Sequence, residues 1–158
     1  MLVLGKGYGA VVMLIDIAKA FLAVKLAQML FPSLFVAGVL AGSAAVAGHI
    51  YPFYLKFKGG KGLASFSGMI LALDPPVFLI LLIIAVTLMF IINYGVAVPI
   101  SAAILFPILY GFRCNNFGAI IISIAVSFLI IAKHISNILK VKRGEDIKIR
   151  DYIKEHLL

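Results

Sequence analysis

The chain has 158 residues, of which 64% are hydrophobic and 13% are charged, and its mean hydropathy is +1.18. Soluble domains have about 45–50% apolar and about 25% charged residues, so this composition excludes a water-soluble globular domain. The abundance of Ile, Leu, Val and Phe, together with a single cysteine at Cys114, excludes disorder and a disulfide scaffold. We therefore expect an all-α, polytopic integral membrane helix bundle that forms a single membrane domain over residues 1–158.

Long uncharged runs, separated by Pro, Gly, Asn and Ser, predict the helices. A bilayer core takes about 20 apolar residues as a helix, and the runs fit about six membrane helices. Their expected ranges are Tyr8–Phe31, Leu34–Ile50, Gly62–Leu73, Val77–Ile92, Gly95–Gly111 and Phe117–Leu139. The third is too short to cross a bilayer alone, so we expect a partial helix whose ends other helices cover. The polar tail, about residues 140–158, is expected to be cytoplasmic, with a short interfacial helix.

The basic residues are distributed unevenly about these helices. Of the 14 Lys and Arg residues, all except Lys19, Lys25 and Arg113 fall on one side of the predicted topology. The positive-inside rule assigns that side, with both termini, to the cytoplasm. The net charge of +8 is explained in this way without a nucleic-acid partner.

Two charged residues lie within the first predicted helix. Asp16 and Lys19 are three positions apart, so they share one helix face and can form an ion pair. Charges inside a membrane tend to face the bundle interior, which leaves two interpretations: a structural pair, or one wall of a polar site. His49, at the end of the second helix, is either an interfacial residue or part of the same site.

The segment from His49 to Ser65, HIYPFYLKFKGGKGLAS, is the most informative part of the chain. Glycines allow successive N–H groups to converge on an anion, and a helix that begins at Gly62 adds the positive end of its dipole. The pattern predicts a phosphate-binding loop. Its expected members are Lys58, Gly59, Gly60, Lys61 and Gly62. The alternative is a flexible loop whose lysines only set the membrane topology.

A second polar pattern begins the tail, in the segment AKHISNILKVKRGED. On a helix, His134, Asn137 and Lys140 recur at steps of three residues, so an imidazole, an amide and an ammonium lie on one face. Such a face suits the recognition of a phosphate or a polyol hydroxyl. The alternative is a collar of basic side chains that extend to the membrane surface.

The central segment GHIYPFYLKFKGGKG closely resembles the central motif of the bacterial acyl-phosphate:glycerol-3-phosphate acyltransferases, the PlsY family. The run KHISNI, followed by RGED, resembles the last motif of that family, and LIDIAKAF resembles its Leu-Asp-x-x-Lys-Gly signature. The three motifs occur in family order over nearly the whole chain.

The resemblance implies transfer of a fatty acyl group from acyl phosphate to the 1-hydroxyl of glycerol 3-phosphate, the first step of phospholipid synthesis. The products are lysophosphatidate and inorganic phosphate. The implied partners are these two substrates and membrane lipids, without nucleic acid, cofactor or metal. The implied location is the bacterial inner membrane, with the active site facing the cytoplasm. The acyl-chain preference and the oligomeric state stay open.

The resemblance also implies roles for individual residues. Lys61 neutralises the departing phosphate, while His134 and Asn137 position glycerol 3-phosphate; these three are the expected catalytic residues. The expected supporting residues are His49, Asp16, Lys19 and Lys140. An acyl phosphate is already activated, so positioning and charge stabilisation are the main requirements. The acceptor of the hydroxyl proton stays open between a substrate phosphate oxygen, His134 and His49.

The chain departs from the family pattern in two ways. Family members have a further membrane span and a Gly-Ser-x-Asn-x-Gly-Ala-Thr-Asn type of motif, whereas this sequence opens with LGKGYGA just after the place where that motif would stand. In the last motif, Ile135 and Lys140 stand where the family has Arg, and neither can hold a phosphate bidentately. We therefore expect the 158 residues alone to be weakly active or inactive.

Two other classes of function are weighed beside the enzyme. One is a non-catalytic lipid-binding or assembly protein of the same fold that has lost a motif. The other is a small transporter, for which polar groups would cross the whole membrane. In this sequence the polar groups gather on one side, which disfavours the transporter.

Overall fold

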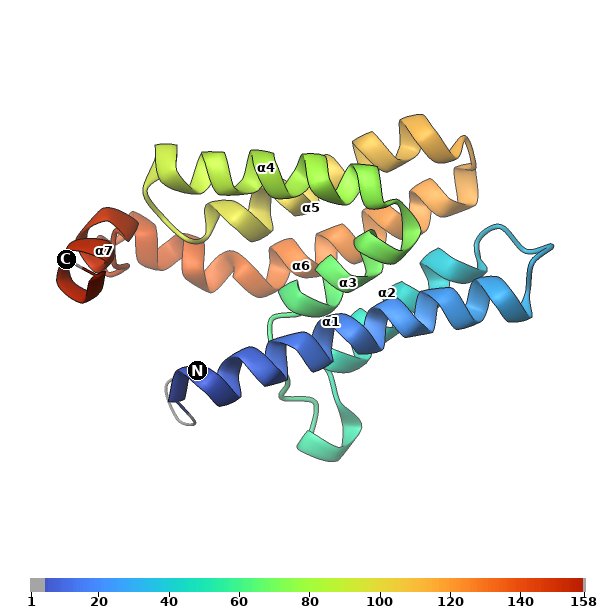
Figure 1. Cartoon of the computed structure of the whole chain (residues 1–158), viewed down its shortest axis with the longest axis horizontal. Helices are drawn as coiled ribbons and strands as arrows, with labels where there is room; N and C mark the ends of the chain where they lie inside the picture. The colour runs from blue at the N-terminus through green and yellow to red at the C-terminus, as the bar shows by residue number, and fades with distance from the viewer. Residues whose placement is uncertain (1–4, 158) are drawn as a thin grey trace.

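The computed structural model describes residues 5–157 of the chain. All regular secondary structure within them is helical, which confirms the expected all-α class (Figure 1). The elements are α1 Gly5–Leu30, α2 Ala37–Ile50, the short 3-10 helix η1 Phe53–Leu55, α3 Leu63–Leu73, α4 Pro75–Ile92, α5 Ala97–Cys114, α6 Phe117–Lys142 and α7 Ile149–Leu157. The outermost residues, predicted to be cytoplasmic, lie outside this description.

The long helices form two packed groups with α3 between them. Helices α4, α5 and α6 lie side by side, α1 and α2 form an antiparallel pair, and α3 contacts α1, α2 and α4 (Figure 1). The buried core lies where the groups meet, and Phe66 of α3 packs edge-on against Phe106 of α5 with ring centroids 5.4 Å apart. The short helix α3 therefore connects the two halves of the bundle.

Three helices among the described residues are long and apolar enough to cross a membrane, judged by length and composition. They are α4, α5 and α6. Helix α3 has 11 residues, about 16 Å at 1.5 Å per residue, so the expected short third helix is confirmed. Its neighbours α1 and α2 cover it, as a non-spanning helix at membrane depth requires.

The predicted helix boundaries shift where local geometry decides them. Helix α2 begins at Ala37 instead of Leu34, because the chain turns first and the Ala37 N–H donates to the Leu34 carbonyl at 2.9 Å. Helix α4 begins at Pro75, since proline suits the first helical turn and the Asp74 carboxylate caps it by accepting from the Val77 N–H at 3.1 Å.

Helices α1 and α3 approach each other at a glycine. A Cβ atom added at Gly68 would overlap the carbonyl oxygen of Ile17 and lie 2.9 Å from the Ile17 Cα atom. Small residues allow this close backbone approach between helices in a membrane. The N-terminus of α3, and the loop before it, are thereby held at a fixed distance from α1.

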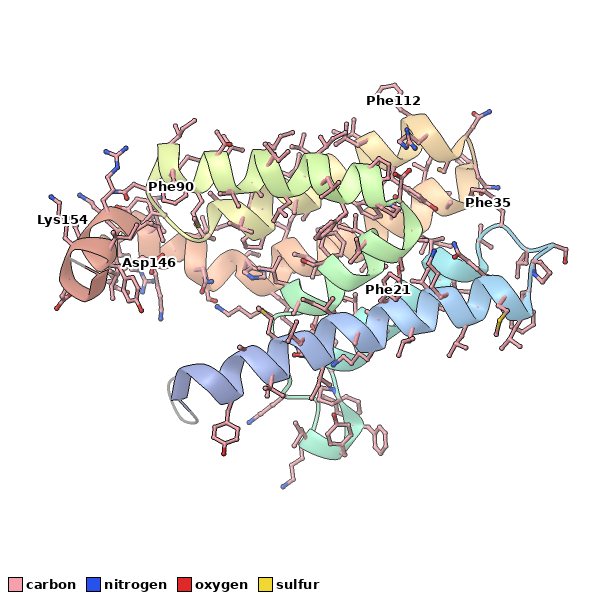
Figure 2. The ribbon with its side chains drawn as sticks, viewed as in Figure 1. Phe21, Phe35, Phe90, Phe112, Asp146 and Lys154 are labelled. Atoms are coloured by element: carbon pink, nitrogen blue, oxygen red, sulfur yellow. The ribbon has the colours of Figure 1, made fainter. Side chains whose placement is uncertain are left out.

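The C-terminal helix α7 lies at one end of the bundle (Figure 1). Figure 2 shows Phe35 and Phe112 towards one end, and Phe90, Asp146 and Lys154 towards the other. At the latter end the predicted helical tail is present as α7, whose first amides donate to Asn93 in the α4–α5 turn: from Ile149 at 3.1 Å to the carbonyl, and from Arg150 at 2.9 Å to the side chain.

Candidate functional site

The loop from Tyr51 to Gly62 projects from the lower edge of the bundle in Figure 1, between α2 and α3. Within it, Lys56 and Phe57 adopt left-handed backbone conformations with φ of 53° and 60°. This region costs a residue with a side chain about 1–2 kcal/mol. Strained backbone of this kind is concentrated at functional sites, where the surrounding structure maintains it.

Gly59 and Gly60 lie against the end of α2. Their N–H groups donate to the carbonyls of Ile50 and His49, at 3.1 and 3.3 Å. A Cβ atom at Gly59 would overlap the His49 carbonyl oxygen, so a side chain does not fit there. In this structure the two N–H groups are therefore engaged with α2, and their expected role as phosphate donors stays a prediction.

The loop ends in the first turn of α3. Gly62 has φ of 84° and forms the N-cap of α3 without a side-chain hydrogen bond, so the free N–H groups of this turn point out of the helix end. Lys58 and Lys61 are exposed in the loop that leads into this turn. The positive end of α3 therefore follows directly after Lys61 in the chain, and this end can attract an anion.

The last motif meets this loop from α6. The Lys61 ammonium donates a hydrogen bond to the Oδ1 atom of Asn137, across 76 residues of sequence. At the other end of the loop, the Lys133 ammonium lies 3.9 Å from the centre of the Tyr51 ring, a cation–π contact. The two predicted polar patterns therefore form one site.

His134 is buried beside these contacts on α6, with 3% of its surface exposed. Its Nδ1 atom lies 2.8 Å from the carbonyl oxygen of Ile130. A carbonyl oxygen only accepts, so Nδ1 carries the hydrogen and Nε2 of the neutral ring has a free lone pair. Lys140, the next member of the predicted face, has an exposed side chain.

The three predicted supporting residues at the end of α2 and in α1 also come together. The Lys19 ammonium lies 2.5 Å from the Asp16 carboxylate and 2.9 Å from His49 Nδ1. The expected Asp16–Lys19 pair is thus formed, and His49 joins it to α2. Among the side chains that the structure describes, no three His, Cys, Asp or Glu residues are grouped as metal ligands.

Two features of the site were not expected from the sequence. Ser65, in the first turn of α3, has a fully buried hydroxyl without a hydrogen-bond partner among the described residues. In the sequence, only its position three residues after Gly62 could have pointed to this serine. The sequence does not single out the contact of Lys133 with Tyr51, because aromatic and basic residues occur throughout both segments.

The chain is similar to known proteins over most of its length. Residues 1–144 match the glycerol-3-phosphate acyltransferase family. The glycerol-3-phosphate acyltransferase of Staphylococcus haemolyticus is 35% identical over 94% of this chain and 76% of its own length. That of Staphylococcus aureus is also 35% identical, over 94% of this chain and 76% of its own length.

Solved structures agree with these relatives. Two crystal structures of PlsY (YgiH), an integral membrane glycerol 3-phosphate acyltransferase, each cover 92% of this chain. The lysophosphatidic acid form has a TM-score of 0.81 at 30% identity over 74% of that chain, and the glycerol 3-phosphate form has 0.82 at 31% over 72%. The fold and site thus define an integral membrane acyltransferase of phospholipid synthesis. The chain belongs to the glycerol-3-phosphate acyltransferase family, which confirms the resemblance of its motifs.

Proposed function

We propose that this chain transfers an acyl group from acyl phosphate to the 1-hydroxyl of glycerol 3-phosphate. The observation that carries the proposal is the hydrogen bond between Lys61 and Asn137, which joins the glycine loop to the last motif. The PlsY structures in glycerol 3-phosphate and lysophosphatidic acid forms support it, since they share this fold.

In the proposed reaction, the hydroxyl oxygen attacks the acyl carbonyl carbon, the bond from that carbon to the phosphate oxygen breaks, and phosphate leaves with the electron pair. The Lys61 ammonium and the free N–H groups of α3 stabilise the charge of the departing phosphate. Lys58, Gly59, Gly60 and Gly62 complete the phosphate-binding loop. Binding of phosphate by the first two glycines requires their N–H groups to leave the α2 carbonyls.

His134 and Asn137 hold glycerol 3-phosphate on the α6 side of the loop. The hydroxyl proton passes to a substrate phosphate oxygen, to His49 or to Nε2 of His134, whose lone pair is free while Nδ1 donates to Ile130. Lys140, one turn beyond Asn137, adds positive charge for the second phosphate. Positioning supplies most of the catalysis, because the acyl donor is already activated.

We also propose the membrane arrangement. The chain makes about six passes as a single membrane domain, in which other helices cover the ends of those helices that are too short to span the bilayer alone. The loop, both termini and the tail of residues 140–158 face the cytoplasm of a bacterial inner membrane, because the lysines and arginines gather there.

The test is an assay of the purified full chain with acyl phosphate and acyl-CoA as alternative donors. We expect turnover with acyl phosphate only. Lys61→Met should lower kcat at least about tenfold, near 1.4 kcal/mol. Lys56→Met, in the same loop, is the matched control and should stay within about twofold.

Absence of turnover with both donors would contradict the proposal. If glycerol 3-phosphate still bound, measured by calorimetry, the non-catalytic lipid-binding or assembly function would take its place. The engaged N–H groups of Gly59 and Gly60 favour that second candidate, since they are not free to bind a phosphate.

A further inference from the structure

We propose that Asp16, Lys19 and His49 form a positioning cluster that holds the loop at Gly60 and so directs Lys61 to Asn137. This inference rests on the proposed function, because it assigns a role in the same site. It gives His49 the task of a spacer that holds the loop at a fixed distance from α1.

The cluster is compact and partly shielded from solvent. Lys19 Nζ lies 2.5 Å from Asp16 Oδ1, and His49 Nδ1 lies 3.1 Å from the same oxygen. The Asp16 and His49 side chains are 15% and 18% exposed, so the carboxylate faces the ammonium and the imidazole more than it faces solvent. Three side chains from two helices therefore restrict one another.

The Nδ1 edge of His49 faces both charged members of the cluster. The Lys19 ammonium lies 2.9 Å from Nδ1, and the Asp16 Oδ1 atom lies 3.1 Å from it. Nδ1 accepts from the ammonium in one tautomer and donates to the carboxylate in the other. In both tautomers this edge of the ring is held by α1.

The opposite edge of the imidazole lies against the loop. A Cβ atom at Gly60 would overlap His49 Nε2 and lie 3.0 Å from Cε1, and the Gly60 N–H donates to the His49 carbonyl at 3.3 Å. His49 thus holds Gly60 through both its backbone and its ring. The next residue is Lys61, whose ammonium donates to Asn137.

This series of contacts connects three helices. Asp16 and Lys19 belong to α1, His49 to α2 and Asn137 to α6, and the loop lies between them. Displacement of the imidazole would free Gly60 and move the ammonium of Lys61 away from its partner. The Nε2 edge of the imidazole is the part of the ring that lies against the loop at Gly60.

The test compares two substitutions of His49 that keep different ends of the ring. The amide nitrogen of His49→Gln reaches about the place of Nε2, whereas the amide of His49→Asn reaches only the place of Nδ1. We expect His49→Gln to retain kcat/KM within about threefold and His49→Asn to lose at least about tenfold. Equal losses in both variants, or none in His49→Asn, would overturn the proposal.

A double-mutant comparison tests whether Lys19 acts through His49. We expect Lys19→Met to lower kcat/KM about tenfold alone and less than about twofold in the His49→Asn background. The matched control is Lys25→Met on the same helix. The Lys25 ammonium lies 3.5 Å from the Gln28 side chain and 5.9 Å from the centre of the Phe21 ring, away from the cluster, and its loss should leave kcat/KM unchanged. Equal effects of Lys19→Met in both backgrounds would show that Lys19 does not act through His49 and would overturn the proposal.

Hydrogen exchange separates this inference from the proposed function. We expect His49→Asn and Lys19→Met to speed exchange at the Gly59 and Gly60 amides about tenfold, without a change in α5. If the chain shows no turnover but exchange responds in this way, the proposed function fails and the positioning of the loop stands. Unchanged exchange at both glycines would overturn the positioning, whatever the turnover.

Discussion

Substitution of Gly68 by alanine tests whether the contact of α1 with α3 holds the site together. The new Cβ atom would overlap the Ile17 carbonyl oxygen and lie 2.8 Å from its carbonyl carbon. Neither atom belongs to a flexible side chain, so the two helices must separate. Overpacking costs about 1–3 kcal/mol, and alanine recovers about 1 kcal/mol of helix propensity. Because the overlap is with backbone atoms, the cost falls in the upper part of that range, about 2–3 kcal/mol. The expected net loss is then about 1–2 kcal/mol in the free energy of unfolding.

A loss of this size should lower Tm by about 2–8 °C, measured by circular dichroism in detergent micelles. The matched control is Gly48→Ala, because a Cβ atom at Gly48 in α2 would meet nothing within 4 Å. That variant should gain about 0.5–1 kcal/mol and melt a few degrees higher. Equal melting temperatures for Gly68→Ala and Gly48→Ala would refute the reasoning from the close backbone approach.

Three further predictions concern other parts of the bundle. Arg113→Leu removes the partner, at 2.5 Å, of the mostly buried Asp74 carboxylate, so Tm should fall by about 2–8 °C; an unchanged Tm contradicts this. Cys114 should react with an impermeant maleimide in intact cells but not in sealed inverted vesicles, and the reverse would reject the assigned orientation. Ser127→Ala removes a buried hydroxyl without a partner among residues 5–157, so Tm should hold or rise. Its control is Ser123→Ala, which breaks a 2.7 Å hydrogen bond to a backbone carbonyl and should melt about 1–4 °C lower.

The helices themselves could be predicted from the sequence. Uncharged runs fix where a helix crosses an apolar layer, and the breakers at Pro32, Asn93 and Asn115 mark the turns, so each expected helix is present within a few residues of its predicted ends. The short α3 was predictable for the same reason. The ends shifted where capping decides them, as at Asp74, because a cap depends on a single side-chain hydrogen bond.

The candidate site was predictable in its members but only partly in its contacts. Residue types and spacing indicated Lys61 and Asn137 separately, and the topology placed both at one end of the bundle. Their hydrogen bond depends on how α6 is rotated against the loop, which packing of the whole bundle determines. The engagement of Gly59 and Gly60 with α2 could not be predicted, because glycine patterns do not tell which carbonyls lie nearby.

Helix α6 contacts the two ends of the loop with side chains one turn apart: Lys133 at Tyr51 and Asn137 at Lys61. This spacing makes the site sensitive to the number of residues in α6, more than to their identity. One residue inserted between Phe117 and Lys133 would rotate both side chains by about 100° and shift them by about 1.5 Å, so both contacts would break together. Substitutions on the lipid-facing side of α6 leave that register intact. Natural variation in this helix should therefore change its residues freely while its length before the loop contacts stays constant.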